Sequence, residues 1–94
     1  VPKNFSLEQN YPNPFNPTTN FRFQISDFGF VTLKVYDISG KEVATLVNEN
    51  LPAGNYERSW NAENLSSGIY FYRIVVVRNG TSLFSETKEM ILLK

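Results

Sequence analysis

Apolar residues recur at every second position of this chain in short runs, and this alternation constrains its fold more than any other feature. Phe21, Phe23 and Ile25 alternate with polar residues, and residues 31–35 repeat the pattern after a turn. A period of two places successive side chains on opposite faces of an extended strand, whereas a helix needs a period near 3.6. Three prolines within residues 12–17 also exclude a helix near the N-terminus. We therefore expect an all-β chain without helices.

Turn residues divide the alternating pattern into about seven segments, at a spacing of roughly 8–12 residues. Asn79-Gly80 is the strongest hairpin signal, because both residues tolerate the positive φ that a type I′ turn requires. The apolar residues of segment 42–47 do not keep to one face, so we expect a bulge there. The expected strands cover residues 5–7, 20–25, 31–35, 42–47, 56–60, 69–77 and 83–93.

Seven short antiparallel strands in about 100 residues are typical of an immunoglobulin-like β-sandwich. The chain has 94 residues, so we expect residues 1–94 to form a single domain, cut from a longer protein. The disulfide common in such sandwiches is absent because there is no cysteine. Side-chain packing alone must hold the two sheets together, and the aromatic residues must fill much of the core.

Several residues that could support chemistry are better explained as parts of turns. Asp27 and Asp37 are the only aspartates, and each lies where we expect its side chain to shape a turn. Arg58 lies between Tyr56 and Trp60 on a face that should be buried, so either it reaches solvent at the rim or the strand faces the other way. We expect every glycine to occupy a turn with positive φ, at positions 29, 40, 54, 68 and 80.

The residue types required for several kinds of site are missing. The chain has no histidine and no cysteine, which excludes thiolate zinc sites, cysteine nucleophiles and histidine acid–base chemistry. The glutamates show no spacing that suggests a glycosidase pair, and the single glycines form no phosphate loop. We therefore predict no catalytic residue, no metal and no cofactor. Nine basic residues balance nine acidic ones, which argues against nucleic-acid binding, and no apolar run is long enough for stable membrane insertion.

Four aromatic residues leave one alternative function open. Tyr11, Phe15, Tyr72 and Phe84 could form a flat platform for sugar rings, although we favour their packing into the core. The platform would suit an accessory carbohydrate-binding or spacer β-sandwich attached to a glycoside hydrolase. A third class to consider is a structural immunoglobulin-like module that mediates assembly, as in flagellar hook-capping proteins.

Three stretches, taken in order, resemble a known family. They are residues 10–19 (NYPNPFNPTT), residues 35–43 (VYDISGKEV) and residues 65–73 (LSSGIYFYR), and residues 87–94 (TKEMILLK) follow as an ending. Together they are similar to the type A C-terminal sorting domain of the type IX, or Por, secretion system. The resemblance covers nearly the whole chain, from Phe5 to Lys94. Arg58 departs from it, since relatives usually have an apolar residue there.

The resemblance implies a signal domain that is not itself an enzyme. Such domains lie at the C-terminus of large exported proteins of Gram-negative bacteria and fold in the periplasm. The outer-membrane translocon then recognises them, and in many members a sortase-like protease removes them at the cell surface. The expected partners are therefore the translocon, this protease and a covalently attached N-terminal cargo. We expect a monomer that is secreted or reaches the cell surface.

By position, the resemblance also marks candidate recognition residues. If the last strand is a sheet edge, its unpaired backbone groups could be read by strand addition, with Lys88 and Lys94 setting the register. We expect both lysines to be exposed, and Tyr70 to be buried with its hydroxyl bonded to nearby backbone. The marked residues are Pro12, Asn13, Pro14, Gly68, Tyr70, Lys88 and Lys94.

Overall fold

A computed structural model describes residues 3–94, and all regular structure in this part of the chain is β-strand. No helix within these residues is long and apolar enough to cross a membrane. The strands occur where the sequence predicts them, although most extend further than expected. They are β1 (Ser6–Leu7), β2 (Thr18–Ile25), β3 (Gly29–Tyr36), β4 (Glu42–Leu51), β5 (Gly54–Asn61), β6 (Gly68–Arg78) and β7 (Thr81–Leu92).

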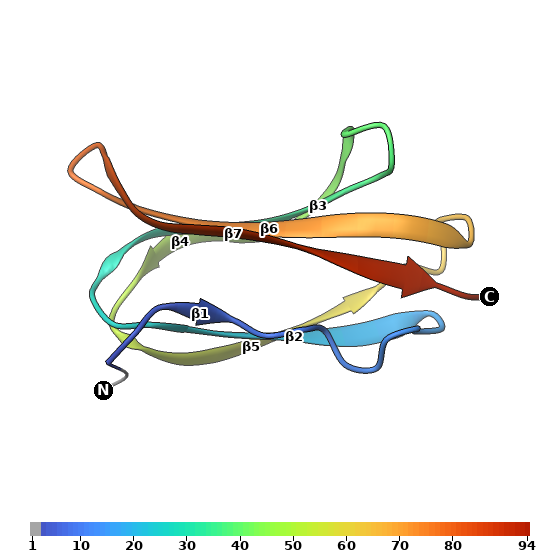
Figure 1. The fold of residues 1–94 in the computed structure, drawn as a ribbon, viewed down its shortest axis with the longest axis horizontal. Helices are drawn as coiled ribbons and strands as arrows, with labels where there is room; N and C mark the ends of the chain where they lie inside the picture. Colours follow the sequence, from blue (N-terminus) through green and yellow to red (C-terminus); the bar gives the residue numbers. More distant parts are fainter. Residues whose placement is uncertain (1–2) are drawn as a thin grey trace.

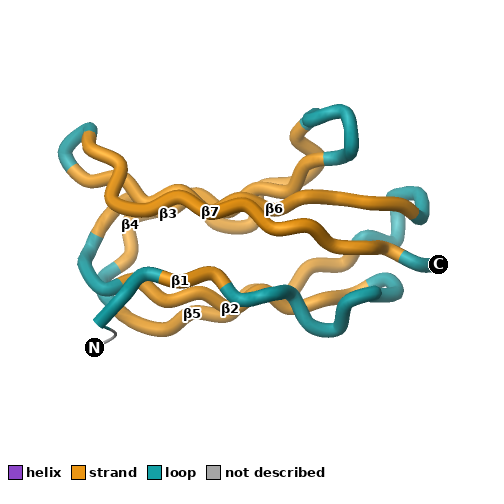
Figure 2. The backbone as a smooth tube through the Cα atoms, viewed as in Figure 1, coloured by secondary structure: helices purple, strands orange, loops and turns teal. Residues whose placement is uncertain are grey.

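The strands form two antiparallel sheets that face each other (Figures 1 and 2). One sheet has the order β1-β2-β5, and the other has the order β4-β3-β6-β7. The fourth strand therefore pairs with the third, and the fifth returns to the smaller sheet beside the second. This arrangement confirms the predicted immunoglobulin-like sandwich. β1 and β7 are edge strands of the two sheets, and they lie on the same side of the molecule.

The core lies between the sheets and consists of the side chains at the inward-facing positions of each strand. Phe21 from β2 meets Tyr72 from β6 edge to face, with the ring centroids 4.7 Å apart. Trp60 from β5 lies 6.1 Å from Phe15 and 6.4 Å from Phe21, measured between ring centroids. These rings bury large apolar areas across both sheets and join them where a related domain would use a disulfide.

Two local irregularities agree with the sequence. The β3–β4 register shifts between Leu33 and Lys34 and again between Val35 and Tyr36, which confirms the expected bulge. Asn79 and Gly80 have φ values of +51° and +77°, as a two-residue hairpin of type I′ requires.

The prediction that every glycine has positive φ is wrong for Gly29 and Gly54. Within the described residues only Gly40, Gly68 and Gly80 have it, at +89°, +156° and +77°. Gly29 instead opens β3 where β6 approaches closely. A Cβ at this position would lie 2.8 Å from the Val76 side chain and 3.1 Å from the Val77 carbonyl oxygen.

Arg58 follows the first of its two expected alternatives. It shares the inner face of β5 with Tyr56 and Trp60, and all three side chains are half-buried. Its guanidinium lies 5.8 Å from the centroid of the Tyr56 ring and donates a hydrogen bond of 2.9 Å to the Glu57 carbonyl oxygen. The arginine therefore covers apolar surface with its stem and keeps its charge at the rim.

Replacement of Gly29 by alanine is expected to destabilise the domain by about 1–3 kcal/mol, because the new methyl overlaps a fixed valine branch and backbone. Denaturant unfolding measures this loss. Gly54→Ala is the matched control, since its Cβ would meet only ordinary contacts of 3.5 Å or more to Tyr56. Equal stability of the two variants would contradict close approach as the reason for Gly29.

Candidate functional site

The proline-rich turn that precedes β2 lies on the outer edge of the last strand. The Asn13 side-chain oxygen accepts a hydrogen bond of 3.0 Å from the Ile91 amide. The Phe15 amide donates a hydrogen bond to the Ile91 carbonyl, and the Phe15 carbonyl accepts one from the Leu93 amide. Both hydrogen bonds are 3.0 Å long. Phe15 itself is buried, whereas residues 11–14 are all exposed. The fold therefore brings together two segments that are more than 70 positions apart, since Ile91 and Asn13 are separated by 78.

A buried polar network behind the turn fixes its position. The Asn10 amide nitrogen Nδ2 donates to Thr19 Oγ1 at 3.0 Å, and this hydroxyl donates to the Pro12 carbonyl at 3.0 Å. Asn10 and Thr19 are 2% and 0% exposed. Within residues 3–94, every buried side-chain polar atom has a hydrogen-bond partner. A fully satisfied network of this kind specifies one arrangement of the backbone.

Tyr72 connects this network to β6. Its hydroxyl accepts a hydrogen bond from the Asn10 backbone amide and donates one to the Glu8 carbonyl, each 2.8 Å long. Burial raises the pKa of Tyr72 to about 12, because removal from water disfavours the phenolate, and the Glu86 charge adds to the effect. The hydroxyl therefore keeps its proton and can donate at any physiological pH.

Gly68 and Tyr70 hold the loop before β6. Tyr70 is 7% exposed, and its hydroxyl donates a hydrogen bond of 2.7 Å to the Ser66 carbonyl, which confirms its expected burial and backbone partner. The neighbouring Ser67 hydroxyl oxygen accepts a hydrogen bond of 2.9 Å from the Lys94 main-chain nitrogen. The loop thus holds the residue that follows the last strand.

The two candidate lysines differ in burial, so the expectation that both are exposed is wrong for Lys88. Lys88 lies on the inner face of β7, with Met90 and Leu92, and forms an ion pair of 3.4 Å with Glu86. The period of two in β7 places it there, because it stands two residues before a core position. Lys94 is exposed, and its ammonium group donates to the Glu63 carbonyl.

The outer edge of β7 is open only in part. The Glu89 carbonyl accepts a hydrogen bond of 2.8 Å from Gln9, and Ile91 and Leu93 bind the proline-rich turn. The backbone groups of Ser85 and Thr87 face the same free edge of β7 as those of Glu89 and Ile91. They have no hydrogen-bond partner among residues 3–94. Addition of a strand from another protein is therefore restricted to the first half of β7.

The four-aromatic platform is not formed. Phe15 and Tyr72 belong to the core at 2% and 0% exposed, and Phe84 stacks on Phe5 with the centroids 5.5 Å apart. Tyr11 alone is fully displayed, at 79% exposed. This outcome removes the observation on which the sugar-platform interpretation depended.

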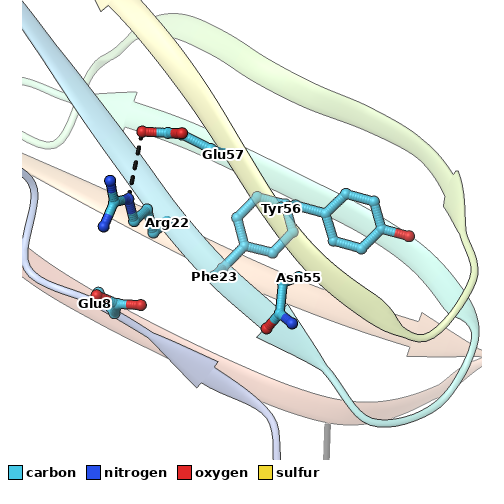
Figure 3. Close-up of a pocket in the computed structure, with 6 residues that line it drawn as sticks. All are labelled: Glu8, Arg22, Phe23, Asn55, Tyr56 and Glu57. Carbon is cyan, nitrogen blue, oxygen red and sulfur yellow. Dashed lines mark hydrogen bonds and ion pairs between the residues drawn. The ribbon is translucent and has the colours of Figure 1, made fainter. Parts of the chain in front are cut away.

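An open hollow lies over the outer face of the smaller sheet (Figure 3). Its volume is about 340 Å³, and its polar lining centres on Arg22, whose Nε lies 3.3 Å from Glu57 Oε2. Glu8 lines the hollow on the other side of Arg22. Sequence reasoning missed this group, because the pairing of β2 with β5 that joins Arg22 to Glu57 is a long-range register.

Both aspartates act in turns, as expected. Asp37 Oδ1 accepts hydrogen bonds from the Ser39 hydroxyl at 2.6 Å and from the Ser39 and Lys41 amides, and the hydroxyl contributes most to lowering the pKa of this carboxyl. Asp27 accepts from the Phe28 amide and pairs with Arg78. In the part of the chain that the structure describes, no three acidic residues gather closely enough to hold a metal ion.

Comparison with solved structures identifies the class of fold. The chain is similar to part of the dimeric latent PorU from Porphyromonas gingivalis, with a TM-score of 0.73 and 22% sequence identity. The match covers 95% of this chain and 9% of the PorU chain. At this identity the likeness supports the sandwich fold. No curated protein matches the chain.

A family model then assigns the chain more narrowly. The secretion system C-terminal sorting domain model matches residues 9–91. The chain therefore belongs to this family, and it is a sorting domain of the type IX secretion system, as the sequence resemblance implies. The matched range includes both the proline-rich turn and nearly all of the last strand. A domain of this family serves export through the periplasm to the cell surface or the medium.

Removal of the Tyr72 hydroxyl, as Tyr72→Phe, is expected to cost about 1–3 kcal/mol, because it leaves the Asn10 amide and the Glu8 carbonyl without their shared partner. Urea unfolding measures the loss. Tyr56→Phe is the control, since the Tyr56 hydroxyl binds the Pro52 carbonyl in an exposed hydrogen bond. A Tyr72→Phe variant as stable as the control would contradict the proposed importance of the network.

Proposed function

We propose that this domain is the C-terminal signal of a larger cargo protein attached to its N-terminus, and that the outer-membrane translocon recognises it. Family membership supports the sorting role. One structural observation supports the mode of recognition: the proline-rich turn and the end of the last strand form a single surface. A translocon that reads this surface reads both segments at once, and only in the folded domain.

The marked residues fall into two groups: exposed residues that a partner can contact directly, and residues that support the position of others. Pro12, Asn13, Pro14 and Lys94 are exposed and available for direct contact. Gly68 and Tyr70 act indirectly, since their loop binds the Lys94 main chain. Lys88 is half-buried beside Glu86, so we assign it a structural role in the edge strand.

The shape of the domain suits such a signal. Its longest dimension is 39 Å, and the described chain starts near one end of this axis, while β7 finishes at the other (Figure 1). A cargo joined at the N-terminus therefore leaves the surface near the C-terminus unobstructed. In this role the domain is a monomeric ligand of the machinery, and a substrate of the sortase-like protease where it is removed. It has no catalytic role of its own.

The test is an export assay. A reporter with a Sec signal peptide and this chain at its C-terminus is expected to reach the surface or medium of a type IX-competent host. Lys94→Ala should reduce export several-fold and shift stability by no more than about 0.5 kcal/mol, because Lys94 is exposed. The exported fraction and the thermal unfolding temperature are measured together. Glu49→Ala is the matched control, as an exposed charge on β4 of the same sheet.

Two outcomes would contradict parts of this proposal. Normal export of Lys94→Ala would exclude the terminal lysine from recognition and leave the turn formed by residues 12–14. If the unmodified fusion stays in the periplasm of a competent host while the chain binds insoluble cellulose or xylan, the sorting role is wrong. The accessory carbohydrate-binding function would then replace it.

A further inference from the structure

We propose that the outer face of the β1-β2-β5 sheet, together with Tyr11, is a docking surface for a positively charged protein segment of the export machinery. The inference rests on the proposed sorting function and assigns a second contact region to it. This surface adjoins the turn and the last strand, because Tyr11 directly precedes Pro12 and Gln9 binds the Glu89 carbonyl, but no marked residue belongs to it.

Tyr11 is held rigidly although it is not packed. Its backbone amide donates to the Asn20 carbonyl at 3.0 Å, and its carbonyl accepts from the Asn20 amide at 2.9 Å. The side chain is nevertheless 79% exposed, more than any other large apolar residue that the structure describes. A fixed and exposed tyrosine loses little entropy on binding, and tyrosines are frequent hot spots of protein interfaces.

The neighbouring side chains form an acidic row across the sheet. The Glu8 amide donates to the Arg22 carbonyl, and Arg22 stands opposite Glu57 in the β2–β5 register, so Arg22 lies between two glutamates. Arg22 pairs with Glu57, and within residues 3–94 Glu8 forms no ion pair. Two carboxylates against one guanidinium leave a surplus negative charge, which favours a cationic ligand and opposes an anionic one.

A hollow of about 220 Å³ joins the tyrosine to this row. Its lining includes Tyr11, Gln9, Asn20 and the three charged residues of the row, so it is continuous with the larger hollow of Figure 3. Gln9 donates from its amide nitrogen to Asn10 and to the Glu89 carbonyl, which leaves its side-chain oxygen as an acceptor. The site is therefore rich in acceptors, as a lysine or arginine side chain requires.

Among the described residues, the outward side chains of β2 and β5 are polar, and Tyr11 is the exposed aromatic residue beside them. Phe23 and Tyr56 also line the larger hollow, but they belong to the inward-facing positions of these strands. The outward positions of β2 and β5 alternate with the core positions of the same strands. Their side chains are Thr18, Asn20, Arg22 and Gln24 on β2, and Asn55, Glu57, Ser59 and Asn61 on β5. One anchor within a polar, charged rim has the composition of a transient interface.

The experiment compares export rates of the reporter fusion with four variants. Tyr11→Ala is expected to lower the rate about tenfold, and Tyr11→Phe should retain most of it, because the ring remains. Glu8→Gln should lower the rate several-fold. Arg22→Gln should leave it unchanged or raise it, because the surface becomes more negative. This opposite response of neighbouring positions distinguishes a cationic partner from general damage to the sheet.

Ile38→Ala is the matched control, since Ile38 is 74% exposed in the turn between β3 and β4 of the other sheet. All variants should keep the thermal unfolding temperature of the parent. Two outcomes would overturn the docking surface alone. One is export of Tyr11→Ala at the rate of the parent, and the other is an export rate lowered by Arg22→Gln but not by Glu8→Gln. Tyr11-dependent retention on cellulose or xylan with unchanged export would also overturn the docking surface, in favour of a glycan ligand. A parent fusion that is not exported would overturn the sorting function, and this inference with it.

Discussion

The arrangement of the proline-rich turn against β7 depends on the hydrogen bonds of the Tyr72 hydroxyl. This hydroxyl joins the Asn10 amide and the Glu8 carbonyl to β6, across 62 and 64 positions of sequence. The Asn10 side chain then positions Thr19 and, through it, the carbonyl of Pro12. The proline-rich turn consequently meets β7 at one fixed place. Without a disulfide, a buried phenol supplies the long-range link, because leaving its partners unpaired in the core would be costly.

The same link reduces the hazard of an open sheet edge. β7 borders the larger sheet, and such edges invite pairing with other chains. Gln9, Asn13 and Phe15 bind the Glu89 carbonyl, both edge groups of Ile91 and the Leu93 amide. Ahead of them, Glu86 and Lys88 point inward from the edge strand, and the β6–β7 register shifts between Val76 and Val77. Inward charges and bulges are both devices that discourage edge pairing, which explains why a half-buried lysine stands two residues before the core.

Local patterns predicted the strands, their number and the sandwich, because period-two alternation and turn residues act over a few positions. The burial of Tyr70 was predicted by analogy with the tyrosine corner of related sandwiches, and its hydroxyl binds backbone only four residues away. The predictions failed at residues whose position or role is determined by contacts with distant parts of the chain. The role of Gly29 depends on Val76 and Val77 of β6, and the Arg22–Glu57 pair depends on the register of β2 with β5. The charge of Lys88 predicts a surface position, although its shared phase with Met90 and Leu92 leaves it half-buried on the inner face of β7. For the candidate site, sequence marked the segments, and only the fold shows that they meet.

These contacts show that the buried residues that fix the position of the turn are distinct from the residues that the turn exposes to solvent. The buried network of Asn10, Thr19 and Tyr72 fixes the backbone, whereas Tyr11 and residues 12–14 extend from it with little packing of their own. Substitutions at the exposed positions can therefore test the proposed recognition without changing the stability of the core. A preorganised surface also avoids the ordering cost that a flexible tail would incur on binding. In the proposed role, a cargo at the N-terminus makes no part of this surface, so the same signal can serve unrelated cargoes, and its recognition reports that the domain has folded.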